Sequence, residues 1–263
     1  MKISAVIITF NEEEKIADAI KSVEWADEIL VVDSESTDRT REVAERLGAR
    51  VIVRKWPGFA AQKQFAVDNA SNDRILSIDA DERVSPALKE EIVRVMKSPD
   101  IADGYRIPRL TTYMGREIRH GGWYPDWQLR FFDRRKGRWK DIAVHESVLM
   151  DADATIRKLS GDLLHYSIDS IAQHSGLIQT RYAPLSAETM KARGEITSAI
   201  KIAVLPPVTF FRTYLLKAGF LDGLAGLVIA YFAAYNVFLK HLLLFETQKK
   251  ANPPHDNPSA TTH

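Results

Sequence analysis

The chain has 263 residues, enough for one large domain or a domain with an appendage, and its 45% apolar and 27% charged content is ordinary for a globular protein. A net charge of +1 gives no reason to expect a nucleic-acid partner. Cysteine is absent, which excludes disulfides, thiolate metal sites and a cysteine nucleophile, and fits a reducing compartment.

Strand-like and helix-like segments alternate over the first hundred residues. Apolar, β-branched runs predict strands at residues 2–9, 28–33, 50–54 and 74–79. Helical periodicity predicts helices at residues 12–26, 38–49, 59–70 and 85–98. This alternation is typical of βαβ units and indicates an α/β fold with a mainly parallel sheet. Ligands of such sheets bind beyond the carboxyl ends of the strands.

Three of the predicted strands end in polar, acidic segments. These are TFNE at residues 9–12, DSES at residues 33–36 and DADE at residues 79–82. A dinucleotide fold needs a glycine-rich first turn so that backbone amides reach the pyrophosphate. The first turn here, TFNEEE, has no glycine and several acids. If the sheet binds a nucleotide, its phosphates therefore need a cation between them and the protein.

Asp79 and Asp81 are two residues apart, so in extended backbone their side chains share a face. Proteins hold Mg²⁺ or Mn²⁺ through one or two carboxylates, and substrate phosphates and water complete the coordination. A solvated turn with a helix-capping acid is the alternative, because SPALKEE follows. Glu82 points elsewhere or caps the following segment, and it is given no role.

Several ordered motifs resemble one family. The segments TFNEE, VVDSESTDRT and LSIDADE, followed by GGWYPDWQLRFF and VHE, are similar to family 2 glycosyltransferases with the Rossmann-like GT-A fold. They most resemble the bacterial branch that adds sugars to the lipopolysaccharide core, of the β-1,4-glucosyltransferase type. The resemblance covers about residues 1–170.

The resemblance implies roles for the residues that match the family's motifs. Thr9, Asn11 and Glu12 match the first loop, which lies against the donor nucleotide. Thr9 and Asn11 could instead only close a turn. Asp33 matches the acid that accepts a hydrogen bond from uracil, or it is a helix cap.

The remaining donor residues come from the third predicted helix and the fourth predicted strand. Lys63 matches a helix position facing the nucleotide, with a solvated charge as the alternative. Asp79 matches the acid near the ribose and metal, and Asp81 matches the metal ligand itself.

An inverting transfer needs a general base for the acceptor hydroxyl. Glu146 matches the family's position for that residue, although many relatives show Glu-Asp where this chain has His-Glu. His145 and Asp126 are the alternatives. Arg130 could reach a phosphate, and the nearby Trp123, Tyr124 and Trp127 could stack on sugars or pack in the core. For His165 a structural role is preferred over a metal ligand.

The last third of the chain changes in composition. Residues 168–200 predict a helix of mixed charge, whereas residues 202–245 are strongly apolar, with Asp222 their single acid. An in-plane helical segment at a membrane interface fits best, with a span and a soluble core or dimer helix as alternatives. The expected organisation is a glycosyltransferase domain at residues 1–170, a helical extension at 171–248 and a disordered tail at 249–263.

These observations together predict an inverting, metal-dependent transferase. The resemblance implies that it moves a sugar, with glucose the first candidate, from a UDP-sugar to lipopolysaccharide core or another glycolipid or polysaccharide. It would work in the cytoplasm, peripheral to the inner face of the bacterial inner membrane. The alternatives are a nucleotidyltransferase acting on sugar phosphates, which the acidic first loop disfavours, and a non-catalytic membrane-bound protein that binds nucleotide sugars.

Overall fold

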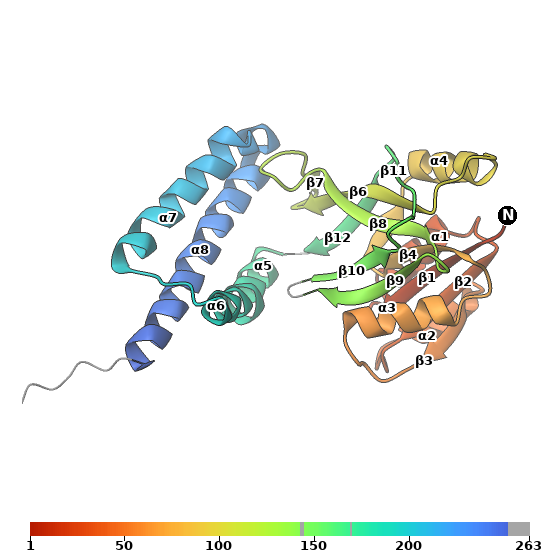
Figure 1. Ribbon diagram of the computed structural model, residues 1–263, viewed down its shortest axis with the longest axis horizontal. Helices are drawn as coiled ribbons and strands as arrows, with labels where there is room; N and C mark the ends of the chain where they lie inside the picture. The colour runs from red at the N-terminus through yellow and green to blue at the C-terminus, as the bar shows by residue number, and fades with distance from the viewer. Residues whose placement is uncertain (143–144, 169, 252–263) are drawn as a thin grey trace, which may run out of the picture. The chain divides into compact units, whose positions relative to one another are not determined.

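The computed structural model describes residues 1–142, 145–168 and 170–251 (Figure 1). The chain forms two compact units. The sheet unit comprises Met1–Arg119 and Trp123–Ser167, and the helical unit comprises His120–Gly122 together with the chain from Ile168 onward. The helical unit thus takes in three residues from the middle of the sequence, His120–Gly122.

Four parallel strands form the first half of the main sheet. They are β1 (Ile3–Thr9), β2 (Glu28–Asp33), β3 (Arg50–Val53) and β4 (Arg74–Asp79). Their order is β3-β2-β1-β4, so the chain runs outward from β1 and then returns to its other side. The strand order therefore reverses between β1 and β4, where such sheets bind ligands. The α/β fold expected for this part is confirmed.

Both faces of these strands are covered because their apolar side chains alternate between the two faces. On one face, Ala5 and Ile7 of β1 pack in a core with α1 (Ile16–Ser22), α2 (Thr40–Arg46) and α4 (Pro86–Met96). On the other face, Val6 and Ile8 pack with α3 (Phe59–Asp68) and with the separate two-stranded ribbon of β9 (Gly137–Ile142) and β10 (His145–Met150).

The second half of the main sheet is largely antiparallel and was not predicted as elements. It contains β5 (Glu82–Val84), β6 (Gly104–Tyr113), β7 (Arg116–Glu117), β8 (Asp126–Asp133), β11 (Ile156–Lys158) and β12 (Leu163–Ile168). Here β8 pairs antiparallel with both β4 and β6, and β5 pairs antiparallel with β12. The sheet as a whole is therefore mixed, and β8 brings the segment from Asp126 to Arg130 beside the end of β4.

Two predicted helices differ from those observed. The first was expected over residues 12–26, but α1 covers only Ile16–Ser22, because Asn11 has a positive φ of 52° and residues 12–15 form a turn. The long helix expected over residues 168–200 is broken. Gly194, with φ of 70°, follows its first part, and the Ser198 side chain caps the next helix.

The helical unit is built from one hairpin and a shorter arm. The arm comprises α5 (Ile171–Leu177), a π-helical turn (Ile178–Tyr182) and α6 (Ala183–Ala192). The hairpin comprises α7 (Ala199–Phe211), a second π-helical turn (Arg212–Leu216), a 3₁₀ turn (Gly219–Asp222) and α8 (Gly223–Ala251). Two stretches, Ala199–Leu216 and Gly219–Lys250, are long and apolar enough to cross a membrane.

Glu28 predicts a pH-dependent contribution to the stability of the sheet unit. Its carboxylate accepts hydrogen bonds from Ser71 N (2.6 Å), from Arg50 Nη2 (2.8 Å) and from the Ser4 hydroxyl. Burial alone would raise the pKa of Glu28, but these hydrogen bonds outweigh it and lower the pKa from 4.5 to about 2. The charge therefore stabilises the fold above pH 4.5, and this stabilisation is lost as the pH falls toward 2.

We expect Glu28→Gln to lower the free energy of unfolding by up to about 3 kcal/mol at neutral pH. The difference from the unmodified protein should shrink between pH 4.5 and 2, as followed by urea denaturation at each pH. The exposed Glu24 offers a control, Glu24→Gln, that should change little at any pH. A Glu28→Gln loss that does not depend on pH would contradict the role given to the charge.

Candidate active site

Three polar residues predicted to contact the donor lie at the carboxyl ends of neighbouring strands. Thr9 ends β1, Asp33 ends β2 and Asp79 ends β4. The strand register pairs Thr9 with Asp33 and Ile8 with Asp79, so the three side chains are at the same edge of the sheet. The structure thus brings together residues separated by 70 positions in sequence.

Several polar atoms near this edge are buried without a hydrogen-bond partner among the described residues. They are Thr9 Oγ1, Asp33 Oδ1 and Gln62 Oε1. The other oxygen of Asp33 accepts from Ser36 N (2.8 Å), and Gln62 Nε2 donates to Ser34 Oγ (3.1 Å). A buried polar atom without a partner costs free energy, so this cluster is suited to a ligand that supplies the missing partners.

Asn11 and Glu12 join the loop after β1 to the loop after β2. Asn11 Oδ1 accepts from Thr37 N (2.8 Å), and Glu12 N donates to Thr40 Oγ1 (2.8 Å). The predicted first-loop residues therefore shape the edge of the site through contacts within the protein.

A chain of alternating charges continues from Asp79 across the sheet. Lys63 Nζ lies 3.0 Å from Asp79 Oδ1 and 3.2 Å from Glu146 Oε1. Arg130 Nη2 donates to Asp79 Oδ2 and to Glu82 Oε1, both at 2.9 Å. The predicted residues Lys63, Asp79, Arg130 and Glu146 thus form one connected group.

Arg109 extends this group to the third candidate base. Its Nη1 lies 3.3 Å from Glu82 Oε1, while its Nε and Nη2 donate to Asp126 Oδ2 at 2.9 and 2.6 Å. Glu82 is fully buried, and its Oε2 also accepts from the backbone N of Asp79 (2.9 Å). Glu82 therefore connects the donor side of the site to Asp126 through two arginines.

Burial of the two cations governs the protonation of this group. Lys63 and Arg130 are each only 2% exposed. Burial alone would raise the pKa of Asp79, but the charges of Lys63 and Arg130 outweigh it and hold that pKa well below its usual range. Burial alone would lower the pKa of Arg130, but Glu82 and then Asp79 raise it above its ordinary value. Asp79 and Arg130 are therefore both ionised at neutral pH, and their charges compensate one another.

Asp81 lies apart from these cations, beside a histidine. Its Oδ2 is 3.4 Å from His165 Nε2, and His165 Nδ1 is 3.2 Å from Thr111 Oγ1. Among the described residues, no group of three or more His, Asp or Glu side chains is placed to hold a metal ion. Asp81 with His165 nevertheless offers oxygen and nitrogen donors that suit Mn²⁺ or Mg²⁺ when a ligand's phosphates supply further oxygens.

The aromatic residue beside the buried cations is not one of those named from the sequence. Trp139 of β9, which was not predicted, has its ring 4.7 Å from Lys63 Nζ and 5.5 Å from the Arg130 guanidinium. Trp127 instead lies under Lys158, and the Tyr124 hydroxyl donates to Asp162. The side chain of His145, the second candidate base, lies outside the described part of the structure.

Sequence reasoning missed Glu82, Arg109 and Trp139. Glu82 was noticed in the DADE segment, but its burial depends on β5 pairing with β12, which brings residues 82–84 beside residues 163–165. Arg109 lies in an ordinary strand sequence, IPRLTTY, and Trp139 in a basic turn region. These three residues reach the site only through the pairing of strands that lie far apart in the sequence.

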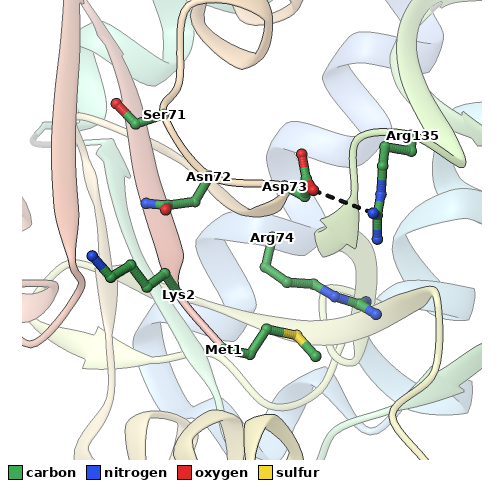
Figure 2. Close-up of a pocket in the computed structure, with 7 residues that line it drawn as sticks. All are labelled: Met1, Lys2, Ser71, Asn72, Asp73, Arg74 and Arg135. Carbon is green, nitrogen blue, oxygen red and sulfur yellow. Dashed lines mark ion pairs between the residues drawn. The ribbon is translucent and has the colours of Figure 1, made fainter.

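A cavity elsewhere on the sheet unit is not part of this site (Figure 2). Its volume is about 370 Å³, and it lies at the amino ends of β1 and β4, where Lys2, Asn72 and Arg135 line it. Arg135, which lines this cavity, is paired with Asp73 at 3.3 Å. The predicted site residues Thr9, Asp33 and Asp79 lie at the opposite, carboxyl ends of the strands.

Arg130 gives a direct test of the buried charges. Arg130→Met removes the positive charge between Glu82 and Asp79. It leaves Glu82 with only Arg109 at 3.3 Å and Asp79 with only Lys63 at 3.0 Å, so we expect the free energy of unfolding to fall by about 3–5 kcal/mol. The matched control is Arg157→Met, which breaks a surface pair with Asp100 (2.7 Å) and should cost less than about 1 kcal/mol. Equal losses in chemical denaturation would contradict the importance assigned to burial.

Known proteins resemble this chain over most of its length. Residues 4–157 match the profile of glycosyl transferase family 2. An uncharacterized glycosyltransferase of Rickettsia bellii (strain RML369-C) is 35% identical, with 96% of this chain and 89% of that protein covered. The lipopolysaccharide core biosynthesis glycosyltransferase LpsC of Rhizobium meliloti (strain 1021) is 30% identical, with 92% of this chain and 94% of that protein covered.

One solved structure with a partial likeness is glucosyl-3-phosphoglycerate synthase from Mycobacterium tuberculosis, in complex with Mn²⁺, uridine diphosphate and glucosyl-3-phosphoglycerate. It is 26% identical, covers 43% of this chain and 44% of its own, and has a TM-score of 0.36. The family profile spans more than half of the present chain, from β1 to β11, and the relatives align over nearly all of it. The chain belongs to glycosyltransferase family 2 and is a glycosyltransferase with the GT-A fold.

Proposed function

We propose that the enzyme transfers a sugar, with glucose the first candidate, from a UDP-sugar to a lipopolysaccharide core or related glycolipid, with inversion and with the help of Mg²⁺ or Mn²⁺. One observation carries the proposal. Lys63 joins Asp79, on the donor side of the site, to Glu146, the candidate base, at 3.0 and 3.2 Å. Donor and acceptor chemistry would therefore meet within one connected group.

The unpartnered atoms at the strand ends support a nucleotide donor. Asp33 Oδ1 is buried without a hydrogen-bond partner among the described residues, and uracil carries an N–H that can donate to it. Thr9 Oγ1 and Gln62 Oε1 add further hydrogen-bonding atoms beside it. Under this proposal Asp33 recognises the uracil ring of the donor.

The charges beyond the nucleoside would hold its diphosphate. Arg130 has two buried nitrogens, Nε and Nη1, without partners among the described residues. Asp81, with His165 beside it, would hold the metal, whereas Asp79 already faces two cations and would mainly orient them. The metal, when bound, supplies charge neutralisation to the leaving diphosphate.

The reaction balances with one protein base. The acceptor oxygen forms a bond to the anomeric carbon, the bond from that carbon to the diphosphate oxygen breaks, and the hydroxyl proton passes to the base. Glu146 suits this role better than Asp126. Asp126 accepts two hydrogen bonds from Arg109 and another from Gln128 (2.7 Å), whereas Lys63 contacts a single oxygen of Glu146.

The acceptor and location follow from the relatives and the composition. LpsC is named for lipopolysaccharide core biosynthesis, and such an acceptor is anchored in a membrane. The apolar helical unit would attach the enzyme to the cytoplasmic face of the inner membrane. The membership of the chain in a glycosyltransferase family argues against the nucleotidyltransferase alternative.

A donor screen tests the proposal. The purified protein would be incubated with Mg²⁺ or Mn²⁺, a panel of nucleotide sugars and membrane-derived acceptors, and release of nucleoside diphosphate would be measured. We expect release from a UDP-sugar that depends on both acceptor and metal, and that chelation abolishes. Release from a different nucleotide class alone would overturn the assignment of the donor.

Asp81 should be required for use of the metal. We expect Asp81→Ala to abolish transfer and metal-dependent binding of UDP, because the remaining carboxylate, Asp79, is held by Lys63 and Arg130. UDP binding can be followed by calorimetry with and without Mn²⁺. The exposed Asp100 provides a control, Asp100→Ala, that should behave like the unmodified enzyme. Metal-dependent turnover by Asp81→Ala would refute the assignment.

Glu146 should act in the chemical step. We expect Glu146→Gln to leave donor affinity unchanged and to lower kcat by about 10²–10⁴-fold, the usual contribution of a positioned base. Asp126→Asn is the matched comparison and should cost less. If Asp126→Asn has the larger effect on kcat, the base is Asp126, and if neither variant slows turnover, the non-catalytic reading gains support.

A further inference from the structure

The outer face of α7 is apolar along its whole length. Every third or fourth residue is large, hydrophobic and at least 49% exposed. Together these residues are called the outer α7 stripe: Ile200, Val204, Val208 and Phe211 of α7, and Leu215 of the π-helical turn that follows it. An ordinary helix on the surface of a soluble protein turns its apolar stripe toward the core and its polar face toward water. Helix α7 departs from this pattern, because its large apolar residues face solvent.

The fold within the helical unit explains why the stripe is left exposed. Helix α7 packs along α8, as Figure 1 shows, and no residue of α7 is buried. The apolar core of the unit is made elsewhere, where Phe232 of α8 packs against Ile178 and Ala183. The stripe spans about 22 Å along the helix axis, at 1.5 Å per residue.

We propose that the outer α7 stripe rests on a lipid bilayer with the hairpin of α7 and α8 lying in the plane of the interface and not crossing it. The proposal deepens the membrane location proposed above and rests on it. It specifies which residues meet the lipid and at what depth, neither of which follows from glycosyl transfer itself.

The turn end of the hairpin argues against a span. His120 N and Nδ1 contact the carboxylate of Asp222 at 2.8 and 2.9 Å, and Gly121 N donates to Lys217 O (2.9 Å). Residues 120–122 are joined by peptide bonds to Arg119 and Trp123, which belong to the sheet unit. Consecutive Cα atoms are only about 3.8 Å apart, whereas a hydrocarbon core is about 30 Å thick. The turn therefore lies on the same side of a bilayer as Arg119 and Trp123, which flank residues 120–122 in the chain.

The end of the hairpin that packs on α6 also argues against a membrane span. Helix α6 packs on α8, and it carries the exposed charged residues Glu188 and Lys191, with Arg193 directly after it. If α8 crossed the bilayer along its length, these charges would enter the hydrocarbon, where a charged side chain is costly. An orientation parallel to the surface keeps α6 in water while the stripe reaches the lipid.

Charge favours a bilayer over a second copy of the chain. Lys201, Arg212 and Lys217 are exposed along α7 and its turn, while Asp222, the single acid in residues 199–245, is buried. A symmetric dimer through this face would bring like charges together with no exposed acid in this segment to pair them. Anionic lipid headgroups would instead attract the same cations.

The absence of cysteine makes the depth directly measurable. Single variants Ile200→Cys, Val208→Cys and Leu215→Cys of the full chain would carry a nitroxide label, and label depth would be measured in vesicles of phosphatidylethanolamine and phosphatidylglycerol. We expect all three labels to lie at one shallow depth. Labels at the exposed Glu90 and Glu188, in Glu90→Cys and Glu188→Cys, should stay in water.

The other outcomes are distinct. A Val208 label much deeper than those at Ile200 and Leu215 would mean that α7 spans, and would overturn only the in-plane geometry. Labels that remain in water would overturn the membrane location as well, while the donor screen would still test sugar transfer. Labels that become immobilised without vesicles, together with a dimer in solution, would replace the bilayer by a second copy.

A substitution gives the second measurement. Val208→Asp puts a charge in the centre of the stripe, and we expect it to weaken binding to the same vesicles at least about tenfold. Its control is Ile156→Asp on β11, which changes another exposed apolar residue (42%) in the sheet unit and should bind normally. Both variants should release UDP from the donor with a detergent-solubilised acceptor at the rate of the unmodified enzyme. Equal vesicle binding by both variants would overturn the proposal.

Discussion

The guanidinium of Arg130 is almost completely buried, and the charged residues of the candidate active site lie around it. Burial of a guanidinium is tolerated only where carboxylates compensate it, and Asp79 and Glu82 do so at 2.9 Å each. Because Lys63 is buried in the same way beside Asp79 and Glu146, the donor-side acid and the candidate base are held in one rigid group. A group that is already compensated needs little reorganisation when a diphosphate arrives, which is how preorganised charge assists group transfer.

This arrangement separates acids that are neighbours in sequence. Asp79 and Asp81 were expected to share one face and one metal, but Asp79 contacts Lys63 and Arg130, whereas Asp81 contacts His165. Glu82, the third acid of the same segment, turns inward and binds both arginines and the backbone of Asp79. The three acids at positions 79, 81 and 82 thereby contact two buried cations, a histidine and two arginines, respectively.

The helical unit obeys the opposite constraint, because its apolar surface faces outward. In the sheet unit, hydrophobic residues are buried in two cores, one on each face of the sheet. In the helical unit, a small core around Phe232 leaves the apolar side of α7 without a protein partner among the described residues. If the enzyme has the soluble donor and lipid-anchored acceptor proposed above, it would benefit from this division, since attachment to the surface would raise the effective concentration of the acceptor.

The sequence by itself determined the alternating first half of the fold, the polar strand ends and the family, because strand periodicity and strand-end motifs are local. It also indicated Lys63, Asp79, Arg130 and Glu146, which the structure brings into contact. Only tertiary structure decided that Glu82, Arg109 and Trp139 join them, since their positions depend on antiparallel pairing between distant strands. It also decided that residues 120–122 belong with the helices, because the bonds to Asp222 and Lys217 link positions about a hundred residues apart, and no local pattern encodes such a contact.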